Sequence, residues 1–377
     1  MTLLESIVPT IVPTIAPAID TKRRGLLFAA GASLALPLLA GCAAPGPGAA
    51  QPSADTLDEP GFLAPPPGTR RPVALVLSGG SARGFAHLGV LRVMEQEGWR
   101  PDLVVGTSAG AIVGALYASG LSVAAIEAAA ATLDWRMLFD FDPVRLLTGG
   151  IGLGIMPGEG LERFLRQHLP LSIERFPTPF AAVAADLQQG EVAVLNQGDA
   201  ARAVLASCAV PGLYAPVRAR RRLLSDGQAV SPLPVLVARS LGAMRVLAVD
   251  VVYPPQHAEM SSPVSVLFQA MVVSAWRLAL AERALADLVL TPEIRSPAQL
   301  GLASRDWVTA AGERAARAQL QPIRALFESV SPGRAAGQPA VGHGARLLPA
   351  DRQAGGGQAL QGAAAPALSP RSAVILR

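Results

Sequence analysis

The sequence predicts a layered α/β fold with a largely parallel central sheet. Short continuous apolar runs, such as Val73–Leu77, are typical of strands buried on both faces of a sheet. Glycine-containing turns follow two of these runs, and each turn leads into a segment whose apolar residues have helical spacing. Strands that alternate with helices in this way favour a parallel sheet covered by helices.

The body of the chain, residues 71–330, divides into alternating predicted elements. Strands are expected at 73–77, 103–105, 179–186, 191–196, 222–225 and 245–252. Helices are expected at 85–96, from Gly110 to about 118, and at 122–134, 158–168, 199–206, 232–241, 264–290 and 305–329. Hydrophobic residues make up 51% of the 377 residues, which is enough for a sizeable core.

The net charge of +4 comes from the two ends of the chain. Lys22, Arg23 and Arg24 form a basic cluster near the start, and residues 331–377 hold five arginines against Asp351. The body between them is close to neutral. Composition therefore gives no support to a nucleic-acid-binding face on the body.

Residues 1–41 have the order of a bacterial export signal. The basic cluster is followed by an apolar run, 25–40, which has the length of a secretory signal and is short for a membrane span. Small residues then precede Cys42, so the segment resembles a lipoprotein signal whose cysteine is lipidated before cleavage. The paired arginines also permit twin-arginine export, and both export routes stay open.

A lipidated Cys42 implies a protein held on a membrane of the bacterial cell envelope. Ala43 follows the cysteine, so the aspartate that would argue for inner-membrane retention is absent, and we expect the outer membrane facing the periplasm. A short transmembrane anchor with an incidental cysteine is the alternative. Residues 42–70 are rich in Ala, Pro and Gly and predict a flexible tether, and residues 331–377 predict a disordered low-complexity tail.

The segment Gly106-Thr107-Ser108-Ala109-Gly110 has the pattern G-x-S-x-G between a predicted strand and a predicted helix. In that context the serine is a nucleophile on a sharp turn. Gly106 and Gly110 would let the backbone turn and the helix pack closely, and the helix N-terminus would place positive dipole near the reacting centre. The pattern predicts Ser108 as the nucleophile of an acyl-transfer hydrolase.

The turn after the first strand is a second candidate part of that site. It reads Gly79-Gly80-Ser81-Ala82-Arg83-Gly84, and its backbone amides from Gly79 to Ala82 would bind the developing oxyanion. Arg83 would either attract a negative substrate or fix the loop. A phosphate-binding loop would need Gly-Lys-Ser/Thr, which is absent, and the glycine spacing does not fit a dinucleotide-binding turn.

The general base is the part that is hardest to find. The four histidines, His87, His168, His257 and His343, all lack a convincing triad context. Asp226 follows an apolar strand and precedes a glycine, and a carboxylate in suitable surroundings acts directly as a base. Taken alone, Asp226 is best interpreted as an ordinary turn aspartate.

Three segments in order resemble the patatin-like phospholipase family, which uses a Ser–Asp dyad. The loop Gly79–Gly84 corresponds to the family's G-G-G-x-R-G, the serine motif to its G-x-S-x-G, and Asp226-Gly227-Gln228 to its D-G-G/A. Residues 206–212 and 230–234 also look like the family's segments around that last motif, and the similarity covers residues 72–290. Ser81 departs from a family glycine, and Gln228 from a small residue, where it would either crowd the site or face outward.

The resemblance implies a three-layer α/β/α sandwich that hydrolyses acyl esters of lipids without metal or cofactor. Ser108 and Asp226 would be the dyad, and the substrate would be a membrane phospholipid or lysophospholipid. A catalytically silent envelope scaffold of the same fold is one alternative, and an esterase or transacylase for soluble substrates is another. The oligomeric state stays open.

Two further features have less specific interpretations. Cys208 is expected to be a small core residue. The stretch from Trp135 to Gly154 combines aromatic and leucine residues with a glycine-rich run. It fits a mobile lid over an acyl-chain groove and an ordinary piece of core equally well.

Overall fold

The computed structural model describes residues 71–132, 153–219, 222–255, 260–294 and 305–329. The predicted signal, tether and tail, with Cys42, lie outside these residues. So does most of the hypothetical lid, from Trp135 to residue 152.

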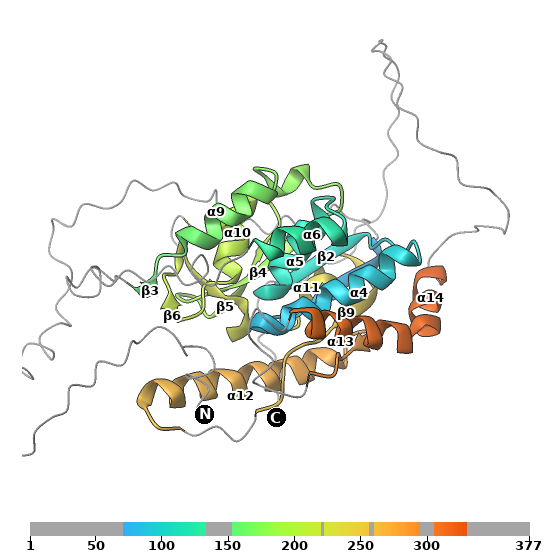
Figure 1. Cartoon of the computed structure of the whole chain (residues 1–377). Coiled ribbons are helices and arrows are strands. Elements are labelled where there is room, and N and C mark those ends of the chain that lie inside the picture. Colours follow the sequence, from blue (N-terminus) through green and yellow to red (C-terminus); the bar gives the residue numbers. More distant parts are fainter. Residues whose placement is uncertain (1–70, 133–152, 220–221, 256–259, 295–304, 330–377) are drawn as a thin grey trace, which may run out of the picture. The chain divides into compact units, whose positions relative to one another are not determined.

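An eight-stranded sheet forms the centre of the described body (Figure 1). Its order is β10-β9-β1-β2-β4-β8-β7, with β5 also paired to β4. The pairs from β10 to β4 are parallel, and those that involve β5, β7 and β8 are antiparallel, so the prediction of a largely parallel sheet is confirmed. The strands are β1 (Arg71–Leu77), β2 (Leu103–Thr107), β4 (Phe180–Asp186), β5 (Glu191–Leu195), β7 (Val217–Ala219), β8 (Arg222–Asp226), β9 (Ala243–Val249) and β10 (Leu288–Leu290).

Helices cover both faces of this sheet. Val73, Leu75 and Leu77 of β1 belong to one core cluster, whereas Ala74 and Val76 belong to another, as expected when successive side chains point to opposite faces. The first cluster includes residues of α4 (Phe85–Gln96), α5 (Ala109–Ala118), α6 (Val123–Ala131), α9 (Glu159–His168), α10 (Ala200–Ser207), α13 (Arg305–Ala318) and α14 (Leu320–Glu328). The second includes residues of α11 (Val235–Ser240) and α12 (Pro263–Arg283). The arrangement is a three-layer α/β/α sandwich.

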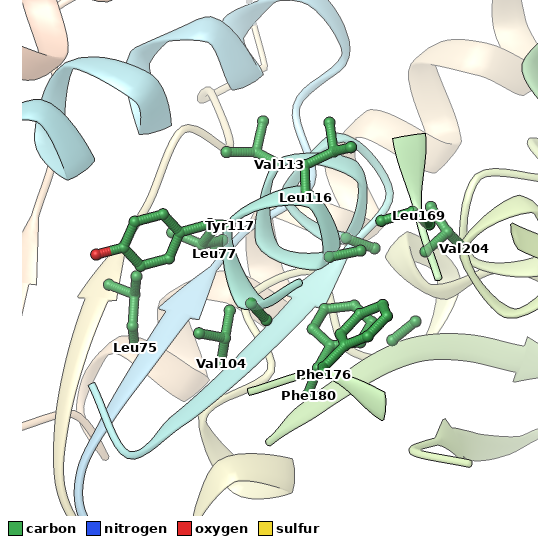
Figure 2. Packing of buried hydrophobic residues seen from close by; sticks show 14 of the residues in the cluster. Leu75, Leu77, Val104, Val113, Leu116, Tyr117, Leu169, Phe176, Phe180 and Val204 are labelled. Atoms are coloured by element: carbon green, nitrogen blue, oxygen red, sulfur yellow. The ribbon is translucent and has the colours of Figure 1, made fainter. Parts of the chain in front are cut away.

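The first cluster is the larger one, and Figure 2 shows how its side chains interlock. Leu77 of β1 and Val104 of β2 lie under α5 at Gly114, where an added Cβ would be 3.0 Å from Val104 Cγ1 and 3.5 Å from Leu77 Cδ1, and Tyr117 of the same helix lies beside Leu77. This packing holds α5 against the sheet directly after the strand that leads into it. The residue between β2 and α5 is therefore held by rigid elements on both sides.

Two predicted helices differ from the observed ones near the C-terminal end of the body. The helix expected at 264–290 ends at Arg283, and Leu288–Leu290 instead pairs in parallel with β9 as an edge strand. The helix expected at 305–329 is divided at Gln319 into α13 and α14. Pro322 lies in the first turn of α14, where a missing backbone N–H costs nothing, so the proline favours a new helix start.

Short strands were the other elements that the sequence did not predict. β7 has three residues, as do β3 (Gly154–Met156) and β6 (Gly212–Tyr214), which pair with each other as a small separate sheet. Such short segments have too few residues to show an alternating or continuous apolar pattern. Their existence depends on partners that lie far away in the sequence.

Candidate active site

Ser108 occupies a strained turn between β2 and α5. Its backbone has φ 53° and ψ −122°, and its side chain is buried. Among the described residues, Ser108 and Ser81 are the non-glycine residues with positive φ. Such a conformation costs of order 1–3 kcal/mol and persists only where the surroundings enforce it.

The glycines on either side of Ser108 make this turn possible. A Cβ atom on Gly106 would overlap the backbone of Gly110, and one on Gly110 would overlap the carbonyl oxygen of Leu77 at the end of β1. Neither position therefore tolerates a side chain. The start of α5 packs directly onto two neighbouring strand ends because these side chains are absent.

Ser207, the last residue of α10, fixes the backbone of the turn. Its hydroxyl accepts a hydrogen bond from the Ser108 amide at 2.9 Å and donates one to the Val183 carbonyl oxygen of β4 at 2.5 Å. Ser207 is completely buried. Sequence reasoning gave it no role, although the segment 206–212 in which it lies was part of the family resemblance.

Strand pairing brings Asp226 to Ser108. β5 pairs along residues 182–186 of β4, so β2 and β8 share the other edge of that strand. In that register Thr107 lies opposite Val183, and Asp226 lies opposite Ala184. The ends of β2 and β8 therefore meet at successive positions of β4, and the Ser108 hydroxyl donates a hydrogen bond of 2.8 Å to Asp226 Oδ2.

The Asp226 carboxylate is almost fully buried, with 2% of its surface exposed. Burial raises its pKa to about 7, and hydrogen bonds from the Gln228 amide and the Ser108 hydroxyl oppose the rise. The Gln228 amide donates to Oδ1 at 2.8 Å, so it leaves Oδ2 facing the serine. A carboxylate with a pKa near neutrality is suited to exchange a proton with that hydroxyl.

The Cys208 thiol borders the same pair. Burial and the negative charge of Asp226 raise its pKa well above the usual value, whereas a hydrogen bond with the Ser108 side chain opposes the rise. The thiol therefore stays protonated and is a poor nucleophile. Cys208 belongs to the core, as the sequence suggested, but it also lies beside the serine.

Hydrogen bonds of Ser78 and His87 support the start of the glycine-rich loop after β1. The neutral His87 ring donates from Nε2 to the Ser78 carbonyl oxygen at 2.9 Å, and Ser78 Oγ accepts a hydrogen bond from the Val251 amide at 2.8 Å. Burial lowers the pKa of His87 to about 4. His87 therefore supports the loop as an uncharged residue and makes no hydrogen bond with Ser108 among the described side chains.

The amides of this loop are not all available to a ligand. The Gly79 amide donates to the Pro232 carbonyl oxygen at 3.0 Å, which removes it from the predicted donor set. Within the described part of the chain, the amides of Gly80, Ser81 and Ala82 have no backbone or side-chain acceptor. They stand at the N-terminal end of the short helical turn η3 (Ser81–Gly84), where free N–H groups favour negative charge.

Arg83 fixes this loop and does not project into solvent. Its side chain is 4% exposed, and its guanidinium group lies 3.7 Å from the centre of the Tyr253 ring. Burial lowers the pKa of Arg83, and interaction with Tyr253 opposes that change. Next to it, a Cβ on Gly84 would lie 2.6 Å from the Ala109 Cβ, so the loop and the start of α5 pack against each other.

The Gln228 side chain faces the glycine-rich loop. The sequence left open whether this side chain crowds the site or faces outward. Its Cγ lies 2.7 Å from the position that a Cβ on Gly79 would take. The side chain is half-buried and fills the space beside Gly79. The residue that departs from the family pattern therefore crowds the base of the glycine-rich loop.

Of the remaining histidines, the structure describes only His168. His168 is on α9, and its Nδ1 lies 2.8 Å from the Phe164 carbonyl oxygen of the same helix. His257 and His343 lie outside the described residues. The described part of the site thus combines a serine hydroxyl, one buried carboxylate and three free backbone amides.

Comparison with known proteins relates part of the chain to a family of lipid hydrolases. Residues 75–239 match the patatin-like phospholipase family. An uncharacterized NTE family protein of Mycobacterium tuberculosis is 35% identical over 180 residues, which cover 47% of this chain and 48% of that protein. Human patatin-like phospholipase domain-containing protein 6 is 36% identical over 186 residues (48% of this chain, 14% of that protein), and a lysophospholipase of Candida glabrata is 35% identical over 188 residues (48% and 10%).

The chain thus spans about half the length of the mycobacterial relative and much less of the other two. Among solved structures, VipD from Legionella pneumophila matches with a TM-score of 0.37 and 13% identity, over 70% of this chain and 67% of VipD. The type III effector protein ExoU matches with a TM-score of 0.39 and 18% identity, over 69% of this chain and 54% of ExoU.

Proposed function

We propose that this chain, whose residues 75–239 match the patatin-like phospholipase family, is a serine acyl hydrolase that cleaves fatty-acyl esters of membrane lipids. The family match and the NTE-type relatives support a lipid acyl hydrolase. One observation supports the specific mechanism most strongly. The Ser108 hydroxyl donates a 2.8 Å hydrogen bond to a buried carboxylate whose pKa is raised to about 7.

In the proposed reaction Asp226 takes the Ser108 proton as Oγ attacks the acyl carbonyl carbon. The carbonyl oxygen becomes an oxyanion, which the amides of Gly80, Ser81 and Ala82 bind. When the tetrahedral intermediate collapses, the ester C–O bond breaks, Asp226 returns the proton to the leaving alcohol, and the acyl group stays on Ser108. Asp226 then takes a proton from water, whose oxygen attacks the acyl-serine, and the fatty acid leaves as Ser108 regains its proton.

The strained turn and the free amides have complementary roles in this mechanism. The positive φ of Ser108 places its side chain at the end of β2, where the hydroxyl meets Asp226. A preorganised amide lowers the barrier because it needs no reorientation when negative charge develops. Loss of one such donor typically lowers the rate by about 10²–10³.

The membrane location is a separate part of the proposal and rests on sequence pattern alone. The basic cluster, apolar run and small residues before Cys42 support a lipid-anchored protein of the cell envelope. Anchoring would hold residues 71–330 beside their substrate on a flexible tether. Metabolic labelling with a radioactive fatty acid tests this directly, because a Cys42→Ser variant should lose the label, and retained label would overturn the assignment.

A lipid-hydrolysis panel tests the enzymatic proposal. Purified full-length chain is assayed on phosphatidylcholine, lysophosphatidylcholine, phosphatidylglycerol and a water-soluble short-chain ester, with Ser108→Ala as the inactive variant. Ser240→Ala is the matched control, because Ser240 is an exposed serine on α11 whose hydroxyl donates to the Val237 carbonyl oxygen of the same helix. Fatty-acid release that depends on Ser108 supports the proposal.

The two alternatives give different results in the same panel. A scaffold protein releases no fatty acid in its wild-type form. An esterase or transacylase for soluble substrates hydrolyses the short-chain ester and leaves the long-chain lipids intact.

A further inference from the structure

Helix α12 has an apolar surface on the side that faces away from the body. Val266, Leu267, Ala270, Val273, Leu278 and Ala281 are all exposed, and their spacing places them along one face of the helix. Leu267 exposes 60% of its surface. We call these six residues the apolar stripe.

The opposite face of α12 packs against the body through both small and large side chains, and Trp276 lies against the same core cluster as Ala279. Ala275 and Ala279 are buried, and Ala279 belongs to the core cluster that α11 covers. A helix of a soluble protein normally directs its large apolar side chains inward. α12 directs Trp276 inward in this way but also exposes Leu267 and Leu278 on its outer side, and Figure 1 shows the helix running along the margin of the body.

Polar contacts at the C-terminal end attach α12 firmly to the body. The Glu282 carboxylate accepts hydrogen bonds of 2.6 Å from the Ser231 hydroxyl and the Val235 amide, and Arg283 forms an ion pair with Asp250. By length and composition α12 is apolar enough to cross a membrane, yet only 22% of its apolar window is buried. Because these contacts hold it against the sheet, we expect it to lie on a surface and not to cross it.

The same contacts connect α12 to the candidate active site. Ser231 accepts, at its carbonyl oxygen, a 2.8 Å hydrogen bond from the Thr107 hydroxyl, and Thr107 immediately precedes Ser108. The turn that follows Asp226 runs directly to Ser231. The C-terminal end of α12 is therefore adjacent to the segment between Asp226 and α11.

The near absence of charge on the exposed face of α12 indicates what kind of surface would bind the apolar stripe. Residues 263–276 contain no charged side chain, and Arg277 is the one charged residue of the exposed face of α12. Such a face offers little attraction for acidic headgroups or for a charged protein partner. It fits the acyl region just below the headgroups of a bilayer, where amphipathic helices bury their apolar side.

We propose that the apolar stripe of α12 inserts shallowly into the lipid surface that carries the substrate and holds the active site against it. This inference rests on the proposed lipid hydrolysis and adds the surface through which the enzyme reaches its substrate. A second copy of the chain, or the apolar run at residues 25–40 of the same chain, would be other occupants of the stripe. The experiment separates these from a bilayer.

Photolabelling from within the membrane tests the proposal in the full-length chain. Phosphatidylcholine vesicles that contain a phosphatidylcholine with a photoreactive group on its acyl tail are mixed with the protein, irradiated, and digested with trypsin. Trypsin cleaves after Arg245 and Arg277, so most of the stripe is recovered in the peptide 246–277. Because the readout is local, an anchor at Cys42 does not mask it.

We expect the label in peptide 246–277, reduced at least fivefold in the double variant Leu267→Gln/Val273→Gln. Leu171→Gln/Leu187→Gln is the matched control, since both leucines are exposed in connections after α9 and β4, and it should label like the wild type. Hydrolysis of vesicle lipid should fall about tenfold in the stripe variant, with hydrolysis of the short-chain ester unchanged.

Each other outcome is decisive. Absence of label in 246–277, with label elsewhere in the protein, overturns the proposal even when lipid is hydrolysed. Label in 246–277 without hydrolysis of any ester supports the stripe and refutes the proposed function. A stripe variant that converts a dimer to a monomer in sedimentation velocity, or label that appears only after removal of residues 1–41, assigns the stripe to a second copy or to the chain's own apolar run and overturns the proposal.

Discussion

The two turns that form the site both have a serine with a positive φ, but the two serines have different surroundings. Ser81 has φ 52° and Ser108 has φ 53°. Ser108 is buried, and its hydroxyl is bonded to Asp226, whereas Ser81 is exposed and its hydroxyl has no partner in the described part of the chain. One turn therefore presents a side chain, and the other presents backbone amides.

This difference explains why Ser81 can stand where the family pattern has a glycine, whereas Ser108 matches the serine of the pattern. The loop turn uses a left-handed residue, for which glycine is the natural choice, and its side chain points to solvent. Serine is tolerated there because only its amide is needed. At position 108 the same strain is kept because a hydroxyl must face a carboxylate.

The largest expected effect is the difference in activity between the alanine variants of the two serines. Ser108→Ala should lower kcat/KM by about 10³ or more, because the nucleophile is lost. Ser81→Ala should lower it by less than about fivefold, because the amide remains. Steady-state hydrolysis of one ester by both variants makes the comparison, and equal losses would refute the division of roles between the turns.

Glycine-to-alanine changes distinguish rigid from adaptable packing in the two turns. Gly110→Ala places a methyl group onto the Leu77 carbonyl oxygen, so we expect unfolding in urea to show a loss of about 3 kcal/mol. Gly79→Ala meets the Gln228 side chain and should cost about 1–2 kcal/mol.

A double variant tests the second value. Gly79→Ala combined with Gln228→Ala should recover most of the lost stability, because the contact is with a side chain that can be removed. Strict additivity of the two changes would show that Gln228 does not occupy the space beside Gly79.

The pH dependence should come from the Ser108 turn and not from the loop. Burial raises the pKa of Asp226 to about 7, so the base form is lost as pH falls through that value, and kcat/KM should fall about tenfold for each further pH unit. His87 beneath the loop, with its pKa lowered to about 4, stays neutral over this range. A pH–rate profile on the short-chain ester measures the midpoint, and a flat profile from pH 5 to 8 would exclude Asp226 as the base.

The contribution of Asp226 to the free energy of unfolding should fall as pH rises, whereas its contribution to kcat/KM should increase. The folded protein holds the Asp226 proton more tightly than the unfolded chain, so this stabilising contribution is complete below the unfolded pKa and is lost as pH rises through about 7. Asp226→Asn should therefore gain stability relative to wild type between pH 5 and 8. Urea unfolding at both pH values checks this sign.

The smallest expected effect is at the support of the loop. His87→Phe removes the donor to the Ser78 carbonyl oxygen but keeps a buried ring, so kcat should fall about fivefold to tenfold through misplaced amides. KM and the pH midpoint should stay close to wild type. A shifted midpoint would mean that His87 takes part in proton transfer, which would contradict its role as a support.

The sequence predicted those features of the site that depend on short contiguous patterns. Apolar runs followed by glycine turns placed Ser108 and the loop correctly at the ends of two strands. Asp226 was different, because an aspartate before a glycine is common in turns. It became a candidate only through the order of three motifs, and its closeness to Ser108 depends on β2 and β8 sharing one edge of β4.

Features that depend on contacts between distant segments could not be read from the chain. The Gly79 amide is used by Pro232, and Ser207 supports the backbone of Ser108 from 99 residues away. The orientation of Gln228 toward Gly79 belongs to the same class. Likewise, the strand at Leu288–Leu290 forms because β9 offers an open edge, which overrides the apolar helical pattern that precedes it.

The most direct test of the central claim is to identify the residue that forms the covalent intermediate. The full-length protein is treated with a long-chain fluorophosphonate, which traps activated serines, and the modified residue is located by peptide mass spectrometry. We predict a single adduct on Ser108 that forms much more slowly in Asp226→Asn and is absent in Ser108→Ala. An adduct on another serine, such as Ser81 or Ser207, or lipid hydrolysis by a protein whose Ser108 stays unmodified, would contradict the Ser108–Asp226 mechanism.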